Sequence, residues 1–299
     1  KKLDKISLRD AQAWINDLGQ RCQCCAQGKD SRRDDKKRRC CGKGDCCFDI
    51  LEARSISDVR ACARSALSHA IYEEQITKNV MSLIKLPPVR KKRKRFWTSD
   101  KARRFLESAR TDSDAMRNAY VLVLAMGFRK GEVLGLRWKD IDFDAEELTI
   151  ELQIQRVKRQ LLHRDVKTAG SRETLPMPDI CIAALRRERE RQVNNQKLAD
   201  DAWRDTGLIF TTALGTPIDP RNFNRSWDNR CLRAGLEKIT IHDGRRTCAT
   251  LLVDLDVHPR HIMRILRHAQ FSISMDIYAQ ASSRTTRAAL KKLSESLEE

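Results

Sequence analysis

Residues 241–280 read IHDGRRTCATLLVDLDVHPRHIMRILRHAQFSISMDIYAQ, and this stretch carries most of what the sequence predicts. It places His242 and Arg245 three residues apart, then His268, and finally Tyr278, one of only three tyrosines in 299 residues. On a helix, residues at i and i+3 share a face, so His242 and Arg245 can point at one anionic group. Cationic, proton-carrying and nucleophilic side chains therefore meet in one short segment.

Two further cations lie upstream, Arg129 in GFRKGEVLGLRW and Lys167 in DVKTAGSRETLPMP, where the turn-forming TAGS separates two strand-like runs. Together the six residues are the parts needed to break a phosphodiester through a covalent phosphotyrosine. Two guanidinium groups can clamp the equatorial oxygens, and a tyrosine can attack and later leave. A lysine or histidine can protonate the departing 5′ oxygen. Because fixed cations supply the charge, no cofactor is expected for catalysis.

The stretches GFRKGEVLGLRWKDID, HDGRRTCATLL and LRHAQ…DIYAQ resemble the signature boxes of the tyrosine recombinase (phage-type integrase) family, over Thr98 to Glu299. The resemblance implies catalytic roles for Arg129, Lys167 (the β-hairpin lysine and general acid), His242, Arg245, His268 and Tyr278 (the nucleophile), with Glu132 as the acidic residue that braces the site. Two neighbours depart from the commonest pattern. Arg246 and Arg267 stand where a histidine and a glycine are frequent, and both add positive charge.

The fold that the resemblance implies is mainly α with a small antiparallel β-sheet, in two domains. A helical core-binding domain spans residues 1–87, and an α/β catalytic domain spans residues 98–299 with a tail helix from about residue 282. Residues 88–97 read as a basic interdomain linker that neutralises DNA phosphates, or alternatively as a solvated, disordered linker. Its basic run comprises Arg90, Lys91, Lys92, Arg93, Lys94 and Arg95. The tail docks on a neighbouring protomer in the family; packing within its own chain is the alternative here.

Local patterns predict the elements of both halves. Helices are expected over residues 8–19, 59–84, 179–193 and 219–236, strands over 146–154, 155–163 and 172–177, and a buried strand with a turn over 207–219. Thr98 or Ser99 offers a helix N-cap, and Asp219 caps a helix with Pro220 in its first turn. Tyr72 and Tyr120 lie in apolar runs and are predicted core tyrosines. The isolated cysteines are predicted to be small core residues, namely Cys62, Cys181, Cys231 and Cys248.

Composition favours a nucleic-acid partner, because 59 Lys and Arg against 41 Asp and Glu give a formal charge of +18. No apolar run is long enough to span a membrane, and no signal-peptide pattern is present. A bacterial, cytoplasmic and nucleoid-associated protein is expected from the family. The chain begins KKLDKISL without a methionine, so we expect a fragment that lacks the additional N-terminal domain that the family often carries.

Seven of the eleven cysteines lie between Cys22 and Cys47. Cys22, Cys25, Cys41 and Cys46 are predicted to bind one structural zinc ion, with Cys24, Cys40 and Cys47 as alternatives. The spacer SRRDDKKRR has no apolar side chain, so the insert needs a metal or disulfides to hold a shape. Disulfides are not expected in a reducing cytosol. Reduced, loosely ordered thiols are the alternative, and the basic residues around them would add a DNA contact.

The resemblance implies a site-specific recombinase, the integrase of a bacterial mobile element. It would cleave and rejoin double-stranded attachment sites through a 3′-phosphotyrosine, as a homo-tetramer on synapsed DNA. A type IB topoisomerase uses nearly the same residues but rejoins the original strand. A non-catalytic DNA-binding protein with a decayed site is the other alternative, and it is disfavoured because all six catalytic positions are retained.

Overall fold

A computed structural model describes residues 2–88, 95–165 and 173–267. The chain divides into two compact units, residues 1–93 and 94–299, so the division falls within the predicted linker segment. Within the described ranges, none of the helices combines the length and apolar character that a membrane crossing requires. The expected mainly helical fold with small antiparallel sheets is confirmed.

The first unit is built on two helices, α1 (Leu8–Leu18) and α3 (Ala53–Tyr72), with the short turns η1 (Leu3–Lys5) and η4 (Val80–Ser82). Ser7 begins α1 with a capping box that Asp10 completes. The predicted helix over residues 59–84 is wrong in its extent. The observed helix starts earlier and ends at Tyr72, because Glu74 adopts a left-handed backbone conformation with φ of 56°.

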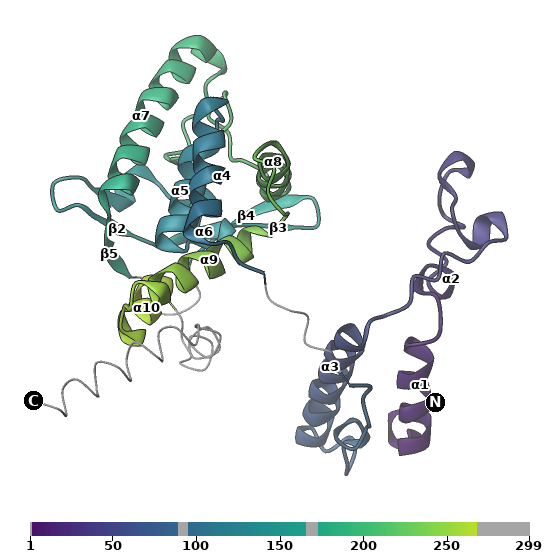
Figure 1. The fold of residues 1–299 in the computed structure, drawn as a ribbon. Helices are drawn as coiled ribbons and strands as arrows, with labels where there is room; N and C mark the ends of the chain where they lie inside the picture. Colours follow the sequence, from purple (N-terminus) through teal and green to yellow (C-terminus); the bar gives the residue numbers. More distant parts are fainter. Residues whose placement is uncertain (1, 89–94, 166–172, 268–299) are drawn as a thin grey trace, which may run out of the picture. The chain divides into compact units, whose positions relative to one another are not determined.

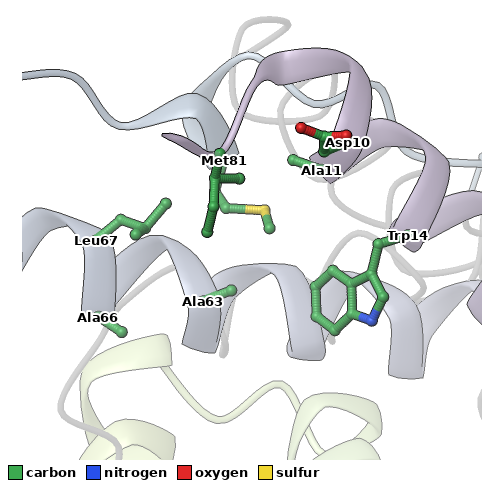
Figure 2. Close-up of a pocket in the computed structure, with 8 residues that line it drawn as sticks. Asp10, Ala11, Trp14, Ala63, Ala66, Leu67 and Met81 are labelled. Atoms are coloured by element: carbon green, nitrogen blue, oxygen red, sulfur yellow. The ribbon is translucent and has the colours of Figure 1, made fainter. Parts of the chain in front are cut away.

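The core of this unit is small and leaves an apolar groove of about 500 Å³. Figure 2 shows Trp14 of α1 and Leu67 of α3 beside Met81 at this groove. Tyr72 is 83% exposed and Cys62 is also exposed, so their predicted core positions are wrong. Within the described residues of this unit, α1 and η4 pack against α3, and of the twenty α3 residues only Ile56, Leu67 and Ala70 are buried.

Between α1 and α3 the chain forms an insert with little regular structure. It contains α2 (Gln23–Ala26), η2 (Asp35–Lys37) and η3 (Cys41–Lys43), and Figure 1 shows it projecting from the two longer helices. Its buried apolar cluster consists of cysteine side chains alone, those of Cys22, Cys24 and Cys40.

The second unit surrounds α5, in which eight of ten residues are buried. Its helices are α4 (Ser99–Thr111), α5 (Arg117–Met126), α6 (Lys130–Gly135), α7 (Asp179–Ala199), α8 (Pro220–Arg233), α9 (Ile241–Asp254) and α10 (Pro259–Leu266), with 3-10 turns η5 (Trp138–Asp140) and η7 (Asp200–Ala202). Helices α4, α7 and α9 pack against α5. The predicted caps Thr98 and Asp219 are confirmed at α4 and α8. Tyr120 is fully buried, as predicted.

The strands form two separate sheets. β1 (Ile141–Asp142), β2 (Glu147–Thr149) and β5 (Thr174–Pro176) pair antiparallel in the order β1-β2-β5, whereas β3 (Leu152–Val157) and β4 (Gln160–Asp165) form a hairpin. Helix α6 lies against β3 because Gly135 has no side chain; a Cβ there would stand 2.6 Å from the Leu152 oxygen. The predicted strand in residues 207–219 is reduced to isolated bridges at Leu208 and Thr211.

Candidate functional site

The site begins where α5 ends and α6 starts. Gly127 ends α5 with φ of +61°, and an added Cβ would collide with the Leu266 side chain. Arg129 then stands at the N-cap of α6, and Glu132 completes the first turn. The Glu132 carboxylate accepts a hydrogen bond from the Arg129 backbone N at 2.8 Å and an ion pair from its Nη1 at 2.6 Å. With a side chain that is 45% exposed, Arg129 is a cation accessible from solvent.

Helix α9 supplies the second arginine. Thr240 and Asp243 form the capping box that starts this helix, so His242 and Arg245 lie in its first turns, as the sequence predicts. The buried Arg245 guanidinium donates from Nη1 to the Gly127 oxygen at 2.6 Å and from Nη2 to the Leu266 oxygen. Its plane is therefore held between the end of α5 and the end of α10.

Three guanidinium groups share this small volume. Burial, Arg129 and Arg267 lower the pKa of Arg245 to about 9, which leaves it charged at neutral pH. Burial would raise the pKa of Glu132, but Arg267 and Arg129 outweigh it and the carboxyl pKa is lowered. Glu132 is therefore an ionised counter-charge within a cationic site.

Arg267 also belongs to this site, as a partner of Glu132 that the sequence did not predict. It ends α10 in a left-handed conformation, with φ of 52°, and its side chain is buried. Its Nη2 pairs with Glu132 at 2.7 Å, its guanidinium lies 4.8 Å from the centre of the Phe128 ring, and its backbone oxygen accepts from Arg129 Nη2 at 3.3 Å. The sequence marked this arginine only as extra charge in place of glycine. Its departure from the family pattern was the one available signal.

His242 lies exposed at the start of α9. Partial desolvation, followed by Arg246 and Arg245, lowers the pKa of its imidazole below the ordinary value. The ring is therefore neutral at pH 7 and can accept or donate a hydrogen bond. Arg246, which stands where the family often has a histidine, forms an ion pair with Asp243 at 2.6 Å.

Several predicted residues lie outside the described residues, namely Lys167, His268, Tyr278, Arg90, Lys91, Lys92, Arg93 and Lys94. Arg95 is described and is exposed. The site residues that the structure does bring together are Arg129, Glu132, His242 and Arg245, from segments more than a hundred residues apart in the sequence.

The cysteines of the insert also converge. The sulfur atoms of Cys22, Cys25, Cys40 and Cys46 all lie within 4.8 Å of one another. The fourth member is Cys40 and not its neighbour Cys41, which is exposed and belongs to neither of the two cysteine groups among the described residues.

Comparison with known proteins decides the family. The family model described as "Phage integrase family" matches residues 95–284, which is well over half of the chain. The chain belongs to the phage integrase family. The matched range contains all six predicted catalytic positions, including those outside the described residues.

Curated members of the phage integrase family resemble the chain over part of their length. It is 31% identical over 175 residues to a tyrosine recombinase XerC-like protein of Caldanaerobacter subterraneus subsp. tengcongensis, covering 54% of the chain and 45% of that protein. It is 25% identical over 268 residues to an integrase of Saccharopolyspora erythraea (72% and 61%) and 23% identical over 235 residues to the ICEBs1 integrase of Bacillus subtilis (76% and 62%). The chain thus spans about half to three-fifths of these relatives.

Solved structures of integrases share the fold. The Tn1549 transposon integrase in complex with circular intermediate DNA matches with a TM-score of 0.73 and 20% identity, over 98% of the chain and 87% of that protein. A lambda integrase dimer bound to a core site matches with a TM-score of 0.58 and 17% identity, over 93% and 81%. At these identities the likeness establishes the fold.

Proposed function

We propose that the chain is the DNA-cleaving and DNA-joining part of a site-specific recombinase that integrates and excises a mobile element. The observation that carries the proposal is the convergence of Arg129 and Arg245 around Glu132, with His242 beside them, in a member of the phage integrase family. Relatives described as integrases or transposon-encoded proteins agree with this substrate class.

The arginines would bind the scissile phosphate. Each terminal nitrogen of a guanidinium carries two hydrogens, so Arg245 keeps donors for an anion while it bonds to Gly127 and Leu266. A phosphate between Arg129 and Arg245 would gain two fixed positive charges as negative charge grows on its equatorial oxygens. Both cations are in place before the substrate arrives, so little reorganisation is needed during the reaction.

Tyr278, His242 and Lys167 would act in the covalent step of the reaction. The Tyr278 hydroxyl attacks phosphorus, and the phosphorus–O5′ bond breaks, giving a 3′-phosphotyrosine and a free 5′ hydroxyl. His242 has a neutral ring at pH 7 and is suited to hydrogen-bond the phosphate or accept a proton, and Lys167 protonates the departing oxygen. Attack by a 5′ hydroxyl from a partner duplex then restores the phosphodiester and releases the tyrosine.

The first test is covalent trapping on nicked suicide duplexes that carry candidate attachment sequences, in buffer without added divalent cations. The expected result is a protein–DNA adduct on a denaturing gel that is lost in Tyr278→Phe. Tyr72→Phe is the matched control, because Tyr72 is exposed in the other unit and should leave the adduct unchanged. A duplex that the protein binds without forming any adduct would overturn the catalytic proposal and favour a DNA-binding role.

Strand exchange distinguishes a recombinase from a topoisomerase with the same active site. We expect labelled attachment duplexes to exchange strands, with a homo-tetramer on the synapsed DNA measured by light scattering during size-exclusion chromatography. Relaxation of supercoiled DNA with no exchanged product would favour a type IB topoisomerase. A complex that never exceeds one protomer per duplex would overturn the tetramer.

A further inference from the structure

The cysteine-rich insert, residues 22–47, has no apolar core apart from its sulfur atoms. Ala26 is the one apolar residue in this segment besides cysteine, and it is exposed. Cys40 is fully buried, and Cys22 and Cys24 are nearly so. Three small thiols bury too little area to fix a segment of this length, so another source of stabilisation is required.

The distances between sulfur atoms are those of a metal–thiolate site. Cys25 Sγ lies 3.5 Å from Cys40 Sγ and 4.0 Å from Cys46 Sγ, and Cys22 Sγ lies 4.0 Å from Cys40 Sγ. A disulfide would require about 2.0 Å. In a zinc tetrahedron with metal–sulfur bonds of about 2.3 Å, neighbouring sulfurs are separated by about 3.8 Å. The first group of four therefore has the size of a zinc tetrahedron.

A second group overlaps the first. Cys24, Cys40 and Cys47 also have their sulfur atoms within 4.8 Å of one another. Cys40 belongs to both groups, and Cys22 of the first group lies 3.7 Å from Cys47 of the second. Two tetrahedral ions need eight ligand positions, which six cysteines can fill only if two sulfurs each bind both ions. Cys40 is shared by both groups, and Cys22 is the first-group sulfur that also contacts Cys47; Cys22 is not grouped with Cys24, so a bridge through Cys22 requires these two sulfurs to come closer when the second ion binds.

We propose that the insert holds a binuclear zinc–thiolate cluster, in which the Cys22 and Cys40 thiolates bridge two Zn²⁺ ions. Cys25 and Cys46 complete the coordination of one ion, and Cys24 and Cys47 complete that of the other. Cys41 takes no part. This cluster replaces the single four-cysteine site expected from the spacing of the residues.

The backbone around the cluster supports the bridging position of Cys40. The Cys47 amide donates to Cys40 Sγ at 3.2 Å, which helps to stabilise a thiolate. The fully buried Asp30 accepts from the Cys40 amide at 2.8 Å and from the Gly42 amide at 3.0 Å. A Cβ on Gly42 would lie 2.8 Å from the same carboxylate. The turn is therefore built to hold Cys40 in one place.

The basic side chains of the insert also suit an anionic cluster. Six thiolates outweigh two divalent ions and leave the cluster anionic, while residues 22–47 contain eight Lys or Arg against four Asp or Glu. The exposed basic side chains are Lys29, Arg32, Lys36, Lys37, Arg39 and Lys43. The cluster thus fixes a cationic loop whose charges partly offset those of the thiolates.

Metal content tests the proposal directly. The 299-residue chain, purified without chelator, should contain two zinc ions per chain by mass spectrometry. Cobalt titration of metal-free chain should reach its endpoint at two equivalents, with the visible absorption of tetrahedral cobalt–thiolate. In the cadmium-substituted chain, ¹¹³Cd NMR should show coupling between two cadmium ions through a bridging sulfur. One zinc per chain, or none, would overturn the cluster.

Cysteine variants assign the ligands. Cys24→Ser should lower the zinc content from two ions per chain to one. Cys22→Ser should weaken the binding of both zinc ions, because Cys22 is a ligand of each. Cys41→Ser is the matched control, next to Cys40 in sequence, and should retain two. Zinc content that is unchanged in Cys24→Ser, or halved in Cys41→Ser, would overturn the assignment. Cys22→Ser can disrupt the fold of the insert. If that variant is insoluble, the zinc content of Cys24→Ser decides the outcome, because Cys24 binds only one of the two ions.

Discussion

Replacing Glu132 by glutamine tests the electrostatics of the site most directly. The substitution keeps the shape of the side chain but removes the charge that Arg267 and Arg129 share. Most of the effect comes from Arg267, because that pair is almost fully buried, with side chains 2% and 5% exposed, and its atoms are 2.7 Å apart. Arg129 is 45% exposed, so water screens its share.

Removing one member of a buried ion pair costs about 3–5 kcal/mol. Glutamine retains one acceptor oxygen, so we expect Glu132→Gln to lower the free energy of unfolding by about 3 kcal/mol. The assay is urea denaturation followed through tryptophan fluorescence, since Trp97 and Trp227 are fully buried in the same unit. Sulfate should recover more stability in the variant than in the unchanged chain, because three guanidinium groups then lack their counter-charge.

Glu107→Gln is the matched control. Glu107 also pairs with an arginine three residues away, Arg110, but both side chains are more than half exposed and should contribute little. The pH dependence adds a second check. The lowered pKa of Glu132 means that its contribution is complete above the ordinary carboxyl pKa and is lost as pH falls through the lower folded-state value. Equal losses in the Glu132 and Glu107 variants at pH 7 would refute this account.

Three further predictions concern the same site. Arg245→Lys should slow adduct formation about 100-fold, because an ammonium cannot bond the Gly127 and Leu266 oxygens and also clamp a phosphate. A gel-shift assay should show unchanged DNA affinity; a loss of affinity as large as the loss of rate would contradict this prediction. Gly127→Ala should destabilise the chain by about 2 kcal/mol in urea, since φ is +61° and the new methyl meets Leu266. The rate of adduct formation should fall only below pH of about 6.5, because the pKa of His242 is lowered; a fall beginning above pH 7 would contradict it.

Local signals in the sequence predicted the helix starts well but not the strands, since the predicted strand over residues 155–163 contains the turn between β3 and β4. Thr98 and Asp219 cap the helices expected of them because capping depends on residues within one turn. The placement of His242 and Arg245 on one helix follows from the same short range. The extent of α3 was missed, since Glu74 ends the helix through a backbone conformation that apolar periodicity does not encode.

Long-range features were beyond the sequence. The spacing of the cysteines did not distinguish Cys40 from Cys41, because the choice depends on Asp30 and on the turn that it holds. Similarly, the burial of Arg267 depends on Glu132, which lies in another part of the chain. Tyr72 occupies an apolar run but is exposed, because none of the described elements of the first unit covers it. None of these outcomes can be read from the few residues next to the one concerned.

The pair between Glu132 and Arg267 spans 135 positions of the chain. During synthesis, Arg129 and Glu132 leave the ribosome long before Arg245 and Arg267 exist. A nascent chain that stops after α8 holds the first arginine with its carboxylate and lacks the two later cations. The cluster of three arginines around Glu132 can therefore form only after the chain has been made as far as Arg267, because Arg245 and Arg267 contact residues that were made much earlier. Under the proposed function, a chain that stops before Arg267 cannot form the full site, so it would not cleave DNA while it is still being made.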